Sequence, residues 1–297
     1  MLLKKEYAMN ECCLKIAVPN KGRLSEDVMD LLQRAGLTIS KNERTLYATT
    51  HDGNYTVIFV RAQDIPGFVS DGVTDLGITG QDIIAEVDLP VEDIMELNFG
   101  HCRMVIATKE ESPANKAEDL SDGIKIATSF PNIARKYFEK LGKKVHITEV
   151  SGATEVTPQL GLADVIVDIT SSGSTLRNNK LKIIGEILQS KAVIIGRPGI
   201  KEEQQTKINA FIRAVKSALD AEEKKYLMAN LPKASLAKIK EFMPGFTSPT
   251  VTMLLDNDND VAIHAVIEKK KVYENIEQLK QLGATGILIM TVDQMVP

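Results

Sequence analysis

The chain has 297 residues, of which 43% are hydrophobic and 26% are charged, and its formal net charge is -4. This is an ordinary globular composition with enough apolar residues for two or three domains. The mild acidity disfavours a general nucleic-acid binder, and the lack of Trp disfavours a stacking platform for single-stranded nucleic acid.

Targeting signals and cysteine pairing are also disfavoured by the sequence. The first residues contain no apolar segment of the length of a secretory signal, and no apolar run approaches the roughly 20 residues of a membrane span. Cys12, Cys13 and Cys102 follow neither a disulfide framework nor a metal-ligand spacing. We therefore expect reduced thiols in a cytoplasmic protein.

The first third of the chain predicts one α/β unit. Ser25 is expected to cap a helix with an apolar face, and Gly36 to end it. Strands separated by helices indicate a parallel sheet. The expected strands are Leu14–Val18, Tyr55–Val60 and Asp75–Thr79, with a short helix at Ile65–Val73 and a strand leaving the unit at Cys102–Ala107.

A second α/β unit is expected to follow, with crossing strands that return the chain to the first. Two such lobes offer a small-molecule site between them. The expected elements are strands at Ile124–Ala127, Val145–Val150 and Val165–Val167, helices at Asn132–Leu141 and Glu155–Leu160, extended segments at Lys182–Ile187 and Lys191–Ile195, the returning segment Ala192–Gly196, and a helix at Glu202–Leu219.

The last 75 or so residues predict the order βαββαβ, the ferredoxin-like arrangement. The strands are Lys225–Leu231, Val251–Leu255, Val261–Ile267 and Gly286–Val292, and the helices are Ser235–Met243 and Lys270–Leu282. Asp256–Asp260 lacks the glycine and the later glutamate of a calcium loop and is interpreted as a hairpin turn. We interpret this region as a regulatory or oligomerising module. The predicted domains are residues 1–106 with 187–223, residues 107–186, and residues 224–297.

The segment DITSSGSTL is the strongest functional pattern. Asp168 follows a buried strand and precedes Thr170, Ser171, Ser172, Gly173, Ser174 and Thr175. Hydroxyls, a glycine and the free N–H groups of a helix start favour phosphate, and an aspartate at the strand end suits two sugar hydroxyls. A ribose 5-phosphate group fits both, and the alternative is a Ser/Gly-rich connection with an Asp cap.

Other strand ends also present polar residues, and strand ends are where open α/β sheets bind ligands. Lys21 and Arg23 flank Gly22 and suit polyphosphate. The alternative for Lys21 and Arg23 is a surface turn, and the alternative for Arg61, Asp64 and Asp82 is a helix cap. The further candidates for polar contacts are Arg61, Asp64, Asp82, Glu149 and Glu155.

Several common enzyme patterns are missing from the sequence. It contains no GxxxxGK[ST] loop, no GxGxxG fingerprint and no obvious catalytic triad. Two alternatives stay open at this point: a non-catalytic solute-binding or sensor protein, and an α/β enzyme with a ferredoxin-like regulatory domain, such as a prephenate dehydratase.

The segment VIVDITSSGSTL resembles the phosphoribosyl-pyrophosphate loop of the ATP phosphoribosyltransferases. Further segments resemble the same family in the same order: AVPNKGRLSE, VRAQDIPGFVSDGVTDLGITGQD, FGHCRMVIAT, KIATSFPNIARKYF and SKAVIIGRPG. The segments PGFTSPTVTMLL and GATGILIMTV resemble the regulatory domain of the long form of this family. Nearly the whole chain is covered by the resemblance.

The resemblance implies a two-lobed catalytic core like that of periplasmic binding proteins, followed by a regulatory domain. It implies transfer of phosphoribose from phosphoribosyl pyrophosphate to N1 of the adenine of ATP, with release of pyrophosphate accompanied by Mg²⁺. It also implies inhibition by histidine and assembly into dimers and hexamers. No protein ligand of the magnesium ion is assigned. Asp168, Arg23 and Lys21 are the expected catalytic residues, and Thr250, Asp256 and Gly286 are guesses for histidine contacts.

Overall fold

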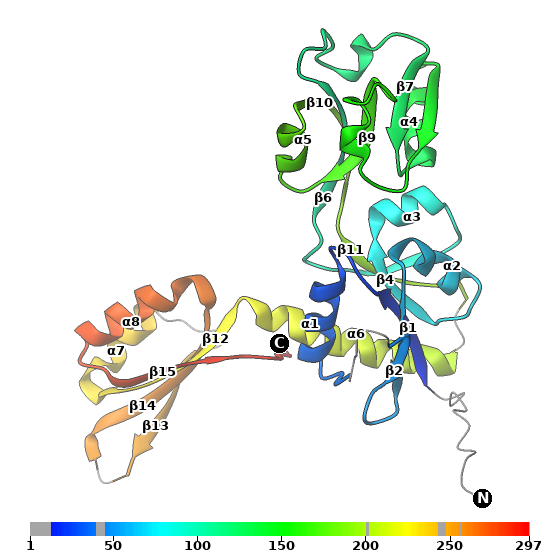
Figure 1. Cartoon of the computed structure of the whole chain (residues 1–297). Helices are drawn as coiled ribbons and strands as arrows, with labels where there is room; N and C mark the ends of the chain where they lie inside the picture. Colours follow the sequence, from blue (N-terminus) through cyan, green and yellow to red (C-terminus); the bar gives the residue numbers. More distant parts are fainter. Residues whose placement is uncertain (1–12, 40–44, 200–201, 243–247, 256, 297) are drawn as a thin grey trace, which may run out of the picture. The chain divides into compact units, whose positions relative to one another are not determined.

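The computed structural model describes residues 13–39, 45–199, 202–242, 248–255 and 257–296. The chain forms two compact units, one of residues 1–30 with 38–208 and the other of residues 31–37 with 209–297. The first unit contains two separate sheets, each with its own helices, and the second contains one sheet (Figure 1).

The first sheet is parallel at its centre and mixed at its margins. Its strand order is β2-β3-β1-β4-β11-β5, in which β1 runs parallel to β3 and β4. β4 and β11 are buried along their whole length, as expected of strands covered on both faces. The bounds are β1 Leu14–Pro19, β2 Tyr47–Thr49, β3 Tyr55–Val60, β4 Leu76–Gly80, β5 Glu92–Glu96 and β11 Ala192–Gly196. β2 and β5 were not predicted.

Helix α1, Ser25–Arg34, follows its predicted pattern. The predicted apolar face is buried at Val28, Leu31 and Leu32. Gly36 ends the helix at φ +90°, and the N–H of Leu37 donates back to the carbonyl of Leu32. The helix therefore begins and ends where the sequence predicts.

Helices α2, Ile65–Ser70, and α3, Gln81–Val87, flank strand β4 in sequence. A Cβ atom at Gly77 of β4 would lie 2.4 Å from Cγ2 of Ile65, so the glycine permits α2 to pack directly against the strand. The predicted helix at Ile65–Val73 is confirmed, although it ends at Ser70.

The second sheet has the order β10-β6-β9-β7-β8, with β7 parallel to β8 and β9. Helix α4, Pro131–Lys140, packs its buried Ile133 and Phe138 into this lobe's core. The strands are β6 Cys102–Lys109, β7 Ile124–Thr128, β8 Val145–Glu149, β9 Val165–Thr170 and β10 Leu181–Ser190.

The predicted helix at Glu155–Leu160 is wrong. The structure has one 3₁₀ turn there, η3, at Thr154–Val156. Pro158 has no N–H to donate, and the hydroxyl of Thr157 donates to the carbonyl of Thr154 at 2.7 Å. The local hydrogen bond thus competes with helix propagation, and the segment stays a turn.

The two lobes of the first unit are joined by hydrogen bonds as well as by the crossing strands. The carboxylate of Glu86 in α3 accepts hydrogen bonds from the backbone N–H groups of Asn132 (2.9 Å) and Ile133 (3.0 Å). These are first-turn N–H groups of α4, which have no partners within the helix. The carboxylate of the neighbouring Asp88 forms an ion pair with the ammonium group of Lys136, with 2.6 Å between Oδ2 and Nζ. Glu86 therefore acts as an N-terminal cap supplied by another element.

The second unit contains α6, Glu202–Glu222, from residue 209 onward, and a four-stranded sheet of order β13-β14-β12-β15. The predicted βαββαβ order is confirmed, and α7 and α8 lie on one side of the sheet (Figure 1). The elements are β12 Lys224–Pro232, α7 Leu236–Phe242, β13 Thr250–Leu254, β14 Asn257–Glu268, α8 Val272–Gln281 and β15 Thr285–Thr291. The core contains Leu227, Ile239, Ile263 and Leu279.

The predicted polar turn at Asp256–Asp260 is wrong from residue 257 onward, because β14 already begins at Asn257. The Asn257 side chain accepts hydrogen bonds from two backbone N–H groups just after it, which holds this polar end in place. Asp256 itself lies outside the described residues. In the described part of the chain, a helix of the length and apolarity needed to cross a membrane does not occur.

We predict that Glu86→Ala lowers the free energy of unfolding by about 1 kcal/mol, the typical cost of removing a helix cap. Urea denaturation followed by circular dichroism measures the change. Glu111→Ala, at an exposed glutamate in a turn of the second lobe, is the control and should have a much smaller effect. Equal stability of the two variants would contradict the capping role.

Candidate functional site

The DITSSGSTL segment forms a strand end, a tight loop and a short helix. β9 continues through Asp168 to Thr170, and α5, Ser174–Asn178, begins after Gly173. Gly173 is buried at φ +73°, a conformation that favours glycine. Its N–H donates to the hydroxyl of Thr170 at 2.8 Å, and the Ser172 and Ser174 hydroxyls lie 2.9 Å apart. The loop therefore gathers hydroxyls around one glycine.

Asp168 is half-buried beside this loop. Burial raises the pKa of its carboxyl; the N–H of Ile169, which donates at 2.8 Å, opposes this, while the charge of Glu155 raises the pKa further. The side chain of Thr154 also hydrogen-bonds the carboxylate. The structure thus brings Asp168 together with Glu155, two residues that the sequence named separately.

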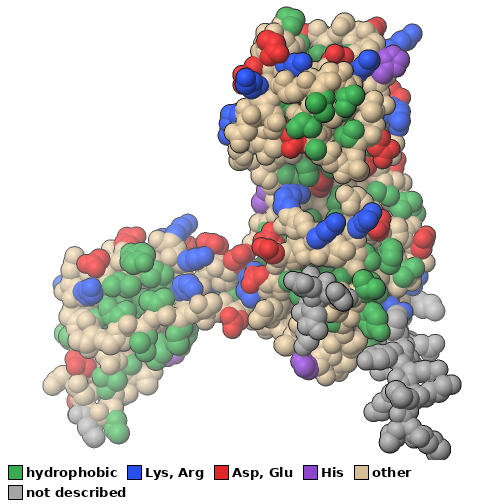
Figure 2. All heavy atoms as spheres, viewed as in Figure 1, with side chains coloured by type: hydrophobic (Ala, Val, Ile, Leu, Met, Phe, Trp, Pro, Cys, Tyr) green, Lys and Arg blue, Asp and Glu red, His purple; other side chains and the backbone are tan. Residues whose placement is uncertain are grey.

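The parallel pairing of β1, β3 and β4 places three predicted segments at one edge of the first sheet. Lys21 and Arg23 follow β1, Arg61 follows β3, and Asp82 follows β4. Lys21, Arg23 and Arg61 are exposed. Lys and Arg side chains gather on the face of this lobe shown in Figure 2, next to its border with the second lobe. This edge of the sheet offers several cations to an anionic ligand.

Asp82 differs from the other candidates because it is 2% exposed. Its carboxylate accepts a hydrogen bond from the Ser190 hydroxyl at 2.6 Å, and its backbone N–H donates to the same hydroxyl at 3.0 Å. The interpretation of Asp82 as a contact to a ligand is therefore not supported by its surroundings, since its carboxylate faces the protein. Asp64, the residue before α2, is exposed.

Three consecutive residues before and at the start of β6 connect these parts, and sequence reasoning missed them. The carbonyl of Gly100 accepts a hydrogen bond from Arg23, and that of His101 accepts one from the Ser171 hydroxyl at 3.3 Å. Cys102 is the register partner of Ser190. We call residues 100–102 the crossover segment. The sequence pointed to this region only through the segment FGHCR, which is part of the family resemblance and contains no recognisable catalytic pattern.

Cys102 is buried at the centre of this arrangement. Burial raises the pKa of its thiol, and the negative charge of Asp82 raises it further. Arg23 and Ser190, whose side chains hydrogen-bond the thiol, act in the opposite direction. The thiol is therefore a buried neutral group that contacts both Arg23 and Ser190, the last residue of β10.

Glu149 and the two described residues expected to contact histidine, Thr250 and Gly286, lie on other strands. Glu149 ends β8 at the edge of the second sheet and is exposed. Thr250 begins β13 and Gly286 lies in β15, the two outer strands of the four-stranded sheet. Three strand spacings separate these outer strands, about 14 Å. The structure therefore does not bring Thr250 and Gly286 together in one chain.

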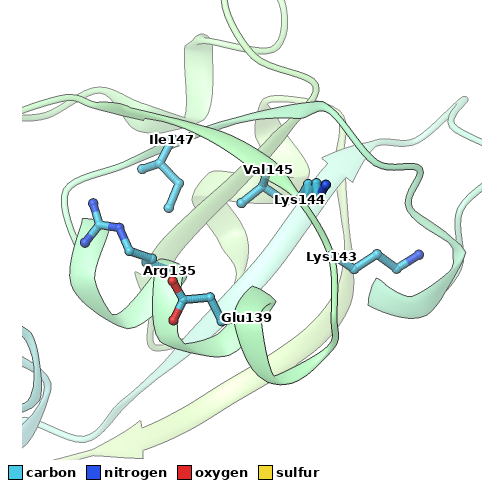
Figure 3. A pocket seen from close by; sticks show the side chains of 6 residues that line it. All are labelled: Arg135, Glu139, Lys143, Lys144, Val145 and Ile147. Carbon is cyan, nitrogen blue, oxygen red and sulfur yellow. The ribbon is translucent and has the colours of Figure 1, made fainter.

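A hollow of about 450 Å³ lies elsewhere on the second lobe, between α4 and the edge strand β8 (Figure 3). Arg135, Glu139, Lys143, Lys144, Val145 and Ile147 line it. None of the predicted site residues is among them. Within the ranges that the structure describes, no three or more His, Cys, Asp or Glu side chains are grouped so that they could hold a metal ion.

The fold and the site together define a two-lobed α/β protein with a hydroxyl-rich loop at a sheet edge and a ferredoxin-like C-terminal domain. The family model described as "ATP phosphoribosyltransferase" matches residues 61–217, and the model "HisG, C-terminal domain" matches residues 221–294. The chain belongs to the ATP phosphoribosyltransferase family.

Relatives match along almost the whole chain. The ATP phosphoribosyltransferase of Methanocaldococcus jannaschii is 45% identical over 95% of this chain and 99% of its own length. That of Natronomonas pharaonis is 44% identical over 96% of this chain and 100% of its own. A chain of the ATP phosphoribosyl transferase (HisG:HisZ) complex from Thermotoga maritima is 29% identical with a TM-score of 0.62, over 70% of this chain and 98% of that one. The resemblance noted from the motifs is confirmed.

We predict that Asp168→Asn raises the free energy of unfolding at pH 7 in the absence of ligand. The folded state raises the pKa of this carboxyl, so its ionisation costs stability as the pH rises through the folded pKa. The gain should shrink as the pH falls towards the ordinary value of 3.8. Urea denaturation at several pH values measures it.

Asp164→Asn is the matched control. Asp164 is an exposed carboxylate just before β9 that accepts a hydrogen bond from the N–H of Lys125. A gain of equal size in this variant, or a loss of stability in Asp168→Asn at neutral pH, would contradict the assigned cause.

Proposed function

We propose that this chain joins N1 of the adenine of ATP to phosphoribosyl pyrophosphate, giving phosphoribosyl-ATP and pyrophosphate, the first step of histidine biosynthesis. One observation carries the proposal beyond family membership. The hydroxyl-rich loop after Asp168 is linked through the crossover segment to the exposed Arg23. A sugar-phosphate site and a polyphosphate site would thus lie at adjoining strand ends, as this reaction requires.

The loop from Thr170 to Thr175 would hold the 5-phosphate, and Asp168 the ribose hydroxyls. Hydroxyl and N–H donors suit phosphate oxygens, and sugar hydroxyls donate to a carboxylate. Such donors stabilise the ionised form of Asp168, whose pKa is raised in the structure. Hydrogen bonds from the sugar hydroxyls should therefore lower the pKa of Asp168 towards its ordinary value.

Lys21, Arg23 and Arg61 would hold the pyrophosphate and ATP phosphates. The reaction needs no protein nucleophile, because the ring nitrogen attacks while pyrophosphate leaves. Positioning and electrostatic stabilisation then supply the catalysis. Mg²⁺ would lower the charge repulsion of the leaving group when bound, held mainly by phosphate oxygens and water. The carboxylates of Asp168 and Glu155 are of the type that the ion prefers, but no ligand is assigned.

The C-terminal domain, from about residue 224, is proposed to bind histidine and to mediate inhibition and homo-oligomerisation. The match of residues 221–294 to the HisG C-terminal domain supports this role. The match to the HisG:HisZ chain from Thermotoga maritima covers only 70% of this chain. We propose that the present chain works without a separate regulatory subunit, in the cytoplasm. The predicted lobe boundaries stay predictions: residues 1–106 with 187–223 for the first lobe, and residues 107–186 for the second.

Asp168→Ala should raise the KM for phosphoribosyl pyrophosphate by roughly 100-fold, because two hydrogen bonds to a charged group are lost. The KM for ATP should change by less than about threefold on the same reasoning. The assay follows the absorbance of N1-substituted adenine with ATP, phosphoribosyl pyrophosphate, Mg²⁺ and pyrophosphatase. Asp164→Asn serves as the control. Absence of product from the folded wild type would defeat the proposed function.

Deletion from Lys225 onward should abolish the effect of histidine. The full chain should bind histidine in a calorimetric titration and lose activity as histidine is added. Binding by the truncated chain would contradict the proposed regulatory domain. The calorimetric readout keeps this test independent of any activity that truncation itself removes.

A further inference from the structure

The buried pair Asp82–Ser190 lies where the chain crosses from the second lobe back to the first. Ser190 is the last residue of β10, and β11 begins at Ala192 in the first sheet. The two residues are 108 positions apart, yet they form two hydrogen bonds through the one serine hydroxyl. Among the described residues, no salt bridge pairs with Asp82, so the bond donated by the Ser190 hydroxyl helps to offset the burial of its carboxylate.

The surrounding backbone makes room for this pair and holds it on both sides. A Cβ atom at Gly80 would lie 2.2 Å from Oδ1 of Asp82, so the carboxylate occupies space that only a glycine leaves open. The N–H of Gln81 donates to the carbonyl of Lys191 at 3.1 Å, and the N–H of Ala192 donates to the carbonyl of Phe99 at 3.1 Å. The crossing is thus bonded to α3 on one side and to the segment before β6 on the other.

The pair is continuous with Arg23 through the crossover segment. Ser190 faces Cys102 across the β10–β6 register, and the Cys102 thiol contacts both the Ser190 hydroxyl and the Arg23 guanidinium. Arg23 also donates to the carbonyl of Gly100. A Cβ atom at Gly100 would lie 2.3 Å from Cδ2 of Leu24, the residue after Arg23. Arg23 therefore contacts Gly100 and Cys102, and the position of these residues depends on the pairing of β6 with β10.

We propose that Asp82 and Ser190 are positioning residues that hold the crossover segment so that Arg23 points its guanidinium at the pyrophosphate group of a ligand. The inference rests on the proposed polyphosphate role of Arg23. Asp82 does not touch the ligand in this account. It acts through the Ser190 hydroxyl, Cys102 and the Gly100 carbonyl, and its effect is carried by geometry rather than by charge.

The test measures binding of inorganic pyrophosphate with Mg²⁺ to the full chain by titration calorimetry. Ser190→Ala and Asp82→Ala should each weaken binding roughly tenfold, as expected when a charged contact is misaligned. Asp82→Asn keeps an oxygen that accepts the serine proton and should bind within about twofold of wild type on the same grounds. Circular dichroism of each variant verifies folding, and Ser190→Ala, the smaller change, serves if Asp82→Ala does not fold.

Two controls remove similar groups away from the crossing. Asp75→Ala deletes a half-buried carboxylate that precedes β4 and accepts hydrogen bonds from Lys15 and Gln204. Ser217→Ala deletes a buried hydroxyl that donates to the carbonyl of Ala214 in α6. Both should bind pyrophosphate as the wild type does.

A double-variant cycle separates positioning from general destabilisation. In an Arg23→Ala background, Ser190→Ala should change the affinity for pyrophosphate by less than about twofold, because the group it positions is gone. If Ser190→Ala weakens pyrophosphate binding as much in the Arg23→Ala background as in the wild type, the inference is overturned. It is also overturned if Ser190→Ala alone or Arg23→Ala alone binds pyrophosphate with wild-type affinity. If the cycle behaves as expected while the wild type makes no phosphoribosyl-ATP, the proposed function fails and the positioning role stands.

Discussion

The structure of the catalytic unit depends on how two strands cross between two sheets that each have their own core. β6 leaves the first lobe at Cys102 and β10 ends at Ser190, and these two residues pair in antiparallel register. The hydrogen bonds of Ser190 with Asp82, and those of Glu86 with the start of α4, join the elements of one lobe to the other. A small shift at this crossing would move both Arg23 and the Ser171 end of the loop.

Two aspartates at strand ends show how burial assigns different roles to the same side chain. Asp82 is fully buried, and its two bonds to Ser190 are made within the protein. Asp168 is half-buried, with its pKa raised by desolvation and by Glu155. A carboxylate whose ionisation is costly in the ligand-free state has free energy to gain from new donors. This contrast favours Asp168 over Asp82 as the ligand contact.

Local patterns were enough for most of the fold. The apolar faces of α1 and α4 and the βαββαβ order follow from periodicity and from glycines at helix ends. β5 was missed because its sequence, EDIME, is largely polar, and β2 because it has only three residues. The helix expected at Glu155–Leu160 does not form, because Pro158 has no N–H to donate and the Thr157 hydroxyl bonds to the carbonyl of Thr154.

The residues of the candidate site could be named from the sequence only where they are contiguous or follow a predicted strand. The hydroxyl-rich loop is contiguous, so Thr170 to Thr175 could be named from sequence, as could the cations after β1 and β3. The Asp82–Ser190 pair joins residues 108 positions apart, and the crossover segment acts through its backbone carbonyls, which have no sequence signature. The separation of Thr250 from Gly286 depends on strand order, which single-sequence reasoning does not supply.

The loop is also organised before any ligand binds. The N–H of Gly173 donates to Thr170, Ser172 lies against Ser174, and Arg177 donates to the carbonyl of Ser172 at 3.1 Å. An entering phosphate would exchange the weak bond from the N–H of Ser174 to the Ser172 hydroxyl, at 3.4 Å, for stronger charged ones. Because the backbone is already folded around Gly173, little ordering entropy would oppose binding. In the proposed function, hydroxyls rather than lysines would provide selectivity for a phosphate of defined position, while the exposed cations across the crossover segment would supply the long-range attraction.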